Sequence, residues 1–264
     1  MRLIIFFIII SGINLNSQDR IFTYTHQSNV LNTGNIELEI YNTFRYGKEN
    51  YFARYDNRIE FEIGVLKNLQ TAFYFNTSSI SKAKESGEND YIIEKRIKSS
   101  FSNEWKLKLS DATINPVGMG LYFEYGIGAD EFELESKLIL DKRFGNFFLA
   151  TNTIYELEFE PEYEHDELEF EKEQEISFNL ALAYKLKKGF HITTEHIIKS
   201  KLETGDLHSP VLYSGIGFSL LKEKFWVNFT LLPKVTTLNK NIINSLNQDD
   251  YEKFQTRLLF SIYL

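Results

Sequence analysis

The densest group of residues that could do chemistry is an acidic stretch between residues 156 and 175, in which His165 and Lys172 are the only basic residues. Side chains two apart on a strand share one face, and like charges packed side by side repel unless cations screen them. We expect a long hairpin that turns near residues 163–166 and projects beyond a rim. It is either a solvated acidic loop or a surface that attracts divalent cations or a basic partner. The acidic residues concerned are Glu156, Glu158, Glu160, Glu162, Glu164, Asp166, Glu167, Glu169, Glu171, Glu173 and Glu175.

A second set of charges shares one face of two consecutive strand-like segments, residues 35–46 and 53–66. If the turn between them centres near residues 48–49, Glu39 lies opposite Arg58 and Glu37 opposite Glu60. This pairing predicts a ladder of ion pairs, and the alternative is that some of these charges line a path for ions or substrate. The candidate lumen-lining residues are Glu37, Glu39, Arg45, Arg54, Asp56, Arg58, Glu60, Glu62 and Glu124.

The residues needed for catalysis are sparse. Nucleophilic catalysis by a serine needs a histidine within hydrogen-bond reach, and His26-Gln27-Ser28 is the stretch with the spacing of a barrel phospholipase. That stretch precedes the first strand, and the adjacent His208-Ser209 is no evidence of a pair. Zero cysteines exclude a thiolate metal site, and there is neither a glycine-rich phosphate loop nor a histidine pair spaced as metal ligands. We therefore assign no catalytic residue, cofactor or metal ligand, and a membrane-embedded lipid hydrolase is the least favoured function.

Composition excludes further classes of protein. The formal net charge is −8 with a pI near 5.3, which argues against a nucleic-acid partner, because neutralising phosphates takes a basic surface. The mean hydropathy of −0.28 excludes a bundle of transmembrane helices but not a transmembrane β-barrel, whose polar lumen offsets its apolar exterior.

The first residues are typical of a secretory signal. Arg2 precedes an apolar run over residues 3–10, which is too short to span a bilayer as a helix, and small and polar residues follow it. We expect cleavage after Ser17, with residues 1–17 as signal peptide and residues 18–264 as one barrel domain.

Strict alternation of apolar and polar residues dominates from Gly34 onward and predicts an all-β fold. Short and long connections alternate between the segments, as they do in closed antiparallel transmembrane barrels, whose short turns face the periplasm. We expect about twelve strands, with ten to fourteen as the range. The expected segments are 35–46, 53–66, 68–78, 98–110, 116–128, 131–142, 145–160, 168–187, 189–200, 210–221, 224–237 and 251–264.

Alternation alone does not say which face points outward, because a soluble lipocalin-type barrel also alternates. Three features favour an apolar exterior. Glycines and charges share one face of residues 117–128, which suits a crowded hydrated lumen, and closure removes the pairing edges of so many strands. Aromatic residues stand toward the ends of the apolar faces, as in a membrane-interface girdle, although Tyr41 has the opposite parity. They are Tyr41, Phe44, Tyr55, Trp105, Tyr155, Tyr184 and Phe225.

Two parts of the chain carry a family resemblance. The last segment alternates up to Tyr263-Leu264, and it resembles the C-terminal strand of Gram-negative outer-membrane proteins, which the barrel-assembly machinery recognises. The segments 22–25, 32–39 and 60–70 resemble a group of functionally uncharacterised outer-membrane β-barrels. The resemblance implies fold, an outer-membrane location, membrane lipids as surroundings and the assembly machinery as a partner, and it implies no activity.

The sequence thus predicts a secreted outer-membrane barrel. The favoured function is a narrow channel or transporter for a small solute. The alternative is a structural or surface-interaction barrel whose acidic hairpin binds cations or a partner.

Overall fold

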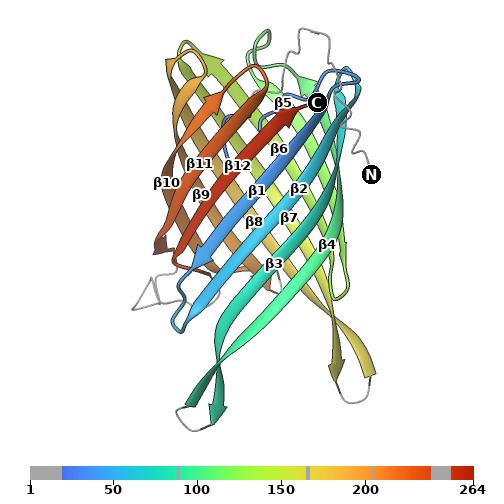
Figure 1. The fold of residues 1–264 in the computed structure, drawn as a ribbon, viewed down its shortest axis with the longest axis vertical. Coiled ribbons are helices and arrows are strands. Elements are labelled where there is room, and N and C mark those ends of the chain that lie inside the picture. The colour runs from blue at the N-terminus through green and yellow to red at the C-terminus, as the bar shows by residue number, and fades with distance from the viewer. Residues whose placement is uncertain (1–19, 88–89, 165–166, 204, 239–250) are drawn as a thin grey trace, which may run out of the picture.

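The computed structural model describes residues 20–87, 90–164, 167–203, 205–238 and 251–264. Within them, twelve strands form a closed barrel in which every strand pairs antiparallel with its chain neighbours, and β1 pairs with β12 (Figure 1). The expected all-β, twelve-stranded closed barrel is confirmed. The strands are β1 (Ile36–Tyr46), β2 (Phe52–Leu66), β3 (Leu69–Gly87), β4 (Asp90–Ser110), β5 (Gly118–Gly128), β6 (Phe132–Phe144), β7 (Phe147–Glu164), β8 (Glu167–Lys187), β9 (Phe190–Glu203), β10 (Asp206–Leu221), β11 (Phe225–Thr237) and β12 (Phe254–Tyr263).

The two ends of the barrel differ. Turns such as 67–68, 145–146 and 188–189 lie at one end, beside the C-terminus, and we call this end the turn rim. The ribbons β3–β4 and β7–β8 extend far beyond the opposite end, the hairpin rim (Figure 1). The expected signal peptide, residues 1–17, lies outside the described residues.

The expected segments 68–78 and 98–110 leave residues 79–97 as a long loop between them. This prediction is wrong. There β3 and β4 continue as a two-stranded ribbon, paired from Leu69 opposite Leu107 to Gly87 opposite Asp90. β5 pairs with β4 only as far as Ser100, so the ribbon beyond that point has left the barrel wall. A ribbon with water on both faces has no need of apolar and polar alternation, which is why the pattern hid these strands.

The strands direct most of their large apolar residues outward, with buried exceptions such as Tyr74, Trp226 and Leu259. On β5, Tyr122 and Glu124 face inward and are buried, whereas Leu121 and Phe123 are 45% and 46% exposed. The same order recurs around the wall, so large apolar side chains form the outer surface and charged ones the interior. This is the arrangement of a membrane-spanning barrel and the reverse of a lipocalin-type one. In the described residues, no helix is long and apolar enough to cross a membrane.

The segment before β1 fills part of the interior. Residues 20–35 form no strand and fold back inside the barrel, where most of them are buried, and we call this segment the plug. Ile21 and Phe22 are 1% and 0% exposed, and the Phe22 ring stacks on Phe148 of β7 at 6.0 Å. The pattern of the sequence predicts only that this segment precedes the first strand, and the plug is a difference from that prediction.

The outward orientation of β5 makes a direct prediction. Phe123→Arg places a charge on the outer face near the middle of the strand, so it should lower the free energy of unfolding by about 2–4 kcal/mol in lipid. The measurement is urea unfolding in vesicles followed by tryptophan fluorescence. Ile97→Arg is the control, since Ile97 is 79% exposed on the projecting ribbon and its substitution should cost little. Equal costs at the two positions would contradict a membrane-facing β5.

Candidate functional site

The plug is held mainly by one carboxylate, that of Glu195 on β9. Its two oxygens accept hydrogen bonds from the backbone N–H groups of Thr23, Tyr24 and Thr25, each at 2.9 Å. The hydroxyls of Thr23 and Thr230 donate to the same carboxylate at 2.8 and 2.9 Å. Glu195 is 0% exposed, so three consecutive amides of an irregular segment find their acceptors inside the barrel.

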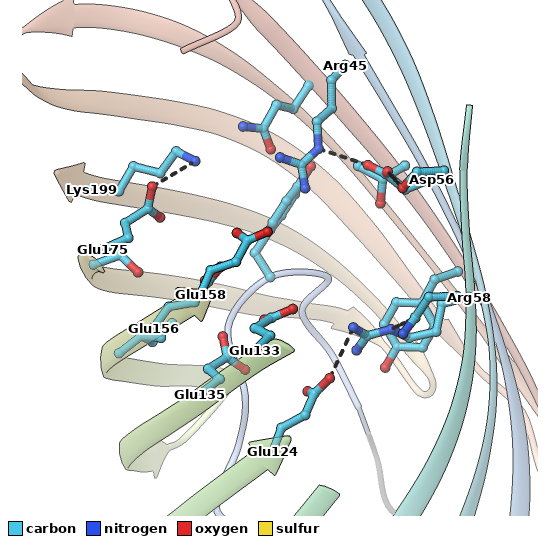
Figure 2. Close-up of a pocket in the computed structure, with 18 of the residues that line it drawn as sticks. Arg45, Asp56, Arg58, Glu124, Glu133, Glu135, Glu156, Glu158, Glu175 and Lys199 are labelled. Atoms are coloured by element: carbon cyan, nitrogen blue, oxygen red, sulfur yellow. Dashed lines mark hydrogen bonds and ion pairs between the residues drawn. The ribbon is translucent and has the colours of Figure 1, made fainter. Parts of the chain in front are cut away.

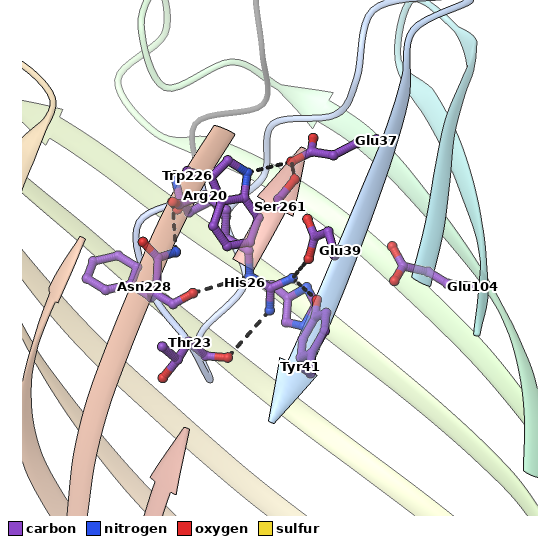
Figure 3. A network of polar contacts seen from close by, with 12 residues as sticks. Arg20, Thr23, His26, Glu37, Glu39, Tyr41, Glu104, Trp226, Asn228 and Ser261 are labelled. Atoms are coloured by element: carbon purple, nitrogen blue, oxygen red, sulfur yellow. Dashed lines mark hydrogen bonds and ion pairs between the residues drawn. The ribbon is translucent and has the colours of Figure 1, made fainter. Parts of the chain in front are cut away.

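Other wall side chains bind the plug backbone in the same way. Asn152 accepts from the His26 N–H at 2.7 Å and donates to the His26 carbonyl at 3.0 Å. Gln70 accepts from the Leu31 N–H at 2.9 Å. Asn228 donates to the Arg20 carbonyl at 2.9 Å, as Figure 3 shows. Polar side chains that water could replace therefore bind the plug backbone, and an apolar cluster adds to them, in which Ile21 and Phe22 pack against Phe148, Ala150, Ala181 and Ala183.

A buried histidine lies at the centre of the plug. The His26 ring packs edge-on against Tyr122 at 5.1 Å, and a ring nitrogen lies 3.3 Å from the Lys137 ammonium. Burial and then the charge of Lys137 lower the pKa of His26 well below its usual value, so the ring is neutral and can accept a hydrogen bond from Lys137. Ser28 instead contacts Asp141 through both its N–H and its hydroxyl. His26 and Ser28 therefore have separate partners, and the geometry gives no support to a hydrolase site there.

A histidine and a serine do meet on the outer face of the barrel. Ser214 Oγ lies 2.8 Å from His196 Nδ1, between adjacent strands β10 and β9. On the other side of His196, its partner in the register of β8 is Leu180. In the described part of the wall, no carboxylate is found that would orient the His196 imidazole. The pair satisfies two polar groups on an apolar surface.

The expected ladder of ion pairs on the first hairpin is wrong. The register differs by two residues from the one expected, and it places Glu37 opposite Glu62 and Glu39 opposite Glu60, while Arg58 lies opposite Tyr41. The turn is centred one residue later than assumed, between residues 49 and 50, because Tyr46 pairs with Ala53. Like charges therefore face one another in the wall.

Between the plug and the hairpin rim the interior encloses a cavity of about 560 Å³. Plug residues Arg20, Tyr24 and His26 line its floor. Five of the nine lumen-lining candidates lie on the wall of this cavity. The other four, Glu37, Glu39, Glu60 and Glu62, are buried beside the plug. The five on the wall are Arg45, Arg54, Asp56, Arg58 and Glu124.

One wall of this cavity carries arginines. Arg45, Arg54 and Arg58 come from β1 and β2, and Arg257 comes from the adjoining β12. Arg45 Nε lies 3.0 Å from Asp56 Oδ2, and Arg58 Nη2 lies 3.4 Å from Glu124 Oε1 (Figure 2). We call these four arginines the arginine wall.

The loop that precedes β12 adds a carboxylate to the arginine wall. Arg45 Nη1 lies 3.6 Å from Glu252 Oε1. Burial alone would raise the pKa of Glu252, yet the charges of Arg45 and Lys199 hold it below its usual value. Glu252 therefore stays ionised and offsets part of the arginine charge.

The opposite wall carries glutamates. Figure 2 shows Glu133 and Glu135 of β6, Glu156 and Glu158 of β7 and Glu175 of β8 across the cavity from Arg45 and Arg58. We call these five residues the acidic wall.

Lysines neutralise only part of the acidic wall. Lys137 pairs with Glu135 at 2.8 Å and Lys199 with Glu175 at 3.6 Å. Within the described part of the chain, no ion pair is found for Glu133, Glu156 or Glu158. The cavity thus has an arginine-rich side and an acidic side that is short of cations.

The acidic stretch forms the projecting β7–β8 hairpin, and its turn, with Asp166, lies outside the described residues. Glutamates face glutamates across it in the pairs 156–175, 158–173, 160–171, 162–169 and 164–167. Neighbouring strands supply cations at its base, where Lys201 lies 2.9 Å from Glu173 and Lys98 lies 2.7 Å from Glu160. Binding of divalent cations or a basic partner by this hairpin stays a prediction.

Comparison with known proteins places this barrel in a family. A model described as "Family of unknown function (DUF6662)" matches residues 15–264. The chain belongs to this family. No curated protein matches the sequence of this DUF6662 barrel.

Solved structures share the fold of the DUF6662 barrel at low identity. The COG4313 outer membrane channel from Pseudomonas putida F1 has a TM-score of 0.58 and 9% identity, over 90% of this chain and 98% of the other. The NanC porin has a TM-score of 0.56 and 9% identity, over 86% of this chain and all of the other. These likenesses show the outer-membrane β-barrel fold alone.

A signal for the missed plug was present in the sequence. An added Cβ at Gly120 of β5 would lie 3.4 Å from the Ser28 Cα, and one at Gly64 of β2 would lie 2.1 Å from the Asn32 carbonyl oxygen. Inward glycines on straight strands therefore mark where another segment of backbone passes close to the wall.

The Glu195 contacts predict how firmly the plug is held. Glu195→Gln keeps the volume but replaces an acceptor oxygen by a donor, so the plug should lose about 1.5–3 kcal/mol of local stability. Hydrogen exchange at the amides of residues 23–25 should then accelerate by about ten- to a hundredfold. Mass spectrometry of peptides from the quenched protein measures this. Glu158→Gln, in the acidic wall, should leave those amides unchanged, and unaltered exchange in the Glu195 variant would contradict its role as anchor.

Proposed function

We propose that the protein is an outer-membrane channel for a small polar solute and that the plug closes it in the conformation described here. The apolar outer surface and the fold support a location in a membrane. The short turns then face the periplasm, as in other barrels of this kind. The cavity would open outward at the hairpin rim, and the plug would close the periplasmic half.

The observation that carries this proposal is the cavity between oppositely charged walls. Its volume of about 560 Å³ is within the range of small-molecule sites. Charges of one sign on each side of a narrow lumen create a field across it, and such a field orients a solute that carries both signs. Glu133, Glu156 and Glu158 are free to receive a cationic group, while the arginine wall faces an anionic one. A small zwitterionic solute is therefore the class that this lumen fits best.

Passage requires the plug to move. Hydrogen bonds to polar groups hold most of the plug, and the net cost of exchanging such bonds for bonds to water is modest. An irregular segment of 16 residues held in this way can be displaced without opening the barrel wall, whose strands keep their own ladder. The apolar contacts of Ile21 and Phe22 with Phe148, Ala150, Ala181 and Ala183 are a part that water cannot replace.

A disulfide can test the plug directly, since the chain has no cysteine. An added Cβ at Gly120 would lie 3.4 Å from the Ser28 Cα, close enough for Ser28→Cys and Gly120→Cys to form a bridge. In liposomes, swelling with a zwitterionic amino acid should stop when the bridge is oxidised and resume when it is reduced. Each single-cysteine variant is the control and should ignore the redox state. Equal flux with the bridge closed and open would refute gating by the plug.

The charged walls predict selectivity. The double variant Glu133→Gln with Glu156→Gln removes two unpaired carboxylates from the cavity, so the preference for cations over anions should fall several-fold. Reversal potentials in planar bilayers under a salt gradient measure this preference. Glu85→Gln, on the exposed β3–β4 ribbon, should leave it unchanged. An unaltered reversal potential in the double variant would show that ions do not pass along the acidic wall.

A further inference from the structure

Five glutamates are buried together beside the plug, outside the cavity that the proposed channel uses. They come from β1, β2 and β4, and none is more than 2% exposed. The register places two pairs directly opposite each other, Glu37 with Glu62 and Glu39 with Glu60. Figure 3 shows Glu37, Glu39 and Glu104 around the plug residue Arg20. We call this group the buried carboxylate cluster; its members are Glu37, Glu39, Glu60, Glu62 and Glu104.

Three members of the buried carboxylate cluster have partners of their own. Glu37 accepts hydrogen bonds from Trp226 and Ser261. Glu39 lies 3.4 Å from Arg20 of the plug.

The third of these is Glu104 of β4. It accepts hydrogen bonds from the Tyr74 hydroxyl and from the Gln70 amide, the latter at 3.5 Å. These contacts fix where the carboxylates point, and they leave most of the negative charge in place.

Glu60 is different. It is 0% exposed, and neither of its carboxylate oxygens has a hydrogen-bond partner in the described structure. Oε2 of the neighbouring Glu62 is buried without a partner as well. Buried charges that lack partners are costly, so these oxygens indicate a missing positive ligand.

The geometry around Glu60 suits one ion. Glu60, Glu62 and Glu104 each offer an oxygen, and these oxygens lie within 4.8 Å of one another. Oxygens that bind Ca²⁺ at about 2.3–2.6 Å lie up to roughly 5 Å apart across the ion, so a single Ca²⁺ could contact all three. Glu62 also belongs to a second such group, with Glu37 and Glu39, and this brings further carboxylate charge close to the same place.

The balance of charges around the buried carboxylate cluster also favours a bound cation. The cations that accompany the cluster are Arg20 of the plug and Lys106, which is buried on the same face of β4 as Glu104. Arg58 pairs instead with Glu124 in the cavity wall. Arg58 also interacts with Glu39 and Glu60, so six carboxylates, Glu124 included, share three cations. A negative excess remains in a buried site, and a divalent ion would remove most of it.

We propose that the barrel binds one divalent cation, of the Ca²⁺ type, through Glu60, Glu62 and Glu104. The three donors are all carboxylate oxygens, which hard cations prefer. Gln70 joins the ion site to the plug, since its amide donates to Glu104 while its carbonyl oxygen accepts from the Leu31 N–H. The ion would therefore link β2 and β4 beneath the end of the plug. This site does not depend on whether the barrel conducts.

The test uses the full chain folded in detergent. Protein folded with EDTA and protein folded with Ca²⁺ are desalted, the bound metal is counted by mass spectrometry, and the melting temperature is measured. The wild type should retain one Ca²⁺ and melt at a higher temperature when folded with it. Glu60→Gln with Glu62→Gln should lose the ion and the dependence of melting on Ca²⁺. Glu133→Gln with Glu156→Gln, in the acidic wall, is the matched control and should keep both.

Two results would overturn the proposal. One is a wild type that retains no Ca²⁺ and melts at the same temperature with and without it, which would mean that protons neutralise the cluster. The other is a cluster variant that still retains the ion, which would place the binding on the acidic wall or the projecting hairpin. The wild-type measurements need no substitution, so they decide the question even if the variant does not fold.

Discussion

The rest of the structure depends on where a membrane-spanning strand can put its charges. A charge on the outer face of such a strand is costly, so each strand turns its polar side chains inward. Twelve strands leave an interior that is narrow as well as polar, and the charges from opposite walls come close together. They must then be hydrated, paired or bound by backbone groups, and the barrel uses all three solutions at different depths.

The plug follows from this constraint. The backbone of an irregular segment has N–H and C=O groups that must be satisfied, and the wall has polar side chains that must be satisfied too. Glu195 and Asn152 bind amides of the plug, and Asn228 binds a carbonyl. Each partner removes the other's cost of burial. Only Ile21 and Phe22 find an apolar patch on the wall, formed by Phe148 and three alanines, Ala150, Ala181 and Ala183.

Alternation was enough to predict the barrel, because the difference between hydrocarbon and water imposes a period of two on every membrane-spanning segment. The same reasoning did not predict the β3–β4 ribbon, because a ribbon with water on both faces needs no alternation of apolar and polar residues. It also failed on the plug, whose contacts link residues as distant as Thr23 and Glu195 without any local pattern. The ladder of ion pairs was wrong because register depends on where the turn is centred. Moving that centre by one residue shifts the pairing by two, which keeps every side chain on the same face while it changes every partner.

The surroundings of a glutamate in this barrel depend on its depth in the lumen. Near the hairpin rim, Glu173 stays close to water and pairs with a lysine, where the charge costs little. Along the cavity, Glu133 and Glu156 face an open space that water or a solute can fill. Beside the plug, Glu60 is fully buried, and no hydrogen-bond donor is found for it among the described residues. Since sequence gives all of them the same inward parity, only the path of the plug separates the hydrated carboxylates from the sealed ones. The plug therefore divides the interior into a region that can exchange solutes and a region whose charge must be balanced permanently.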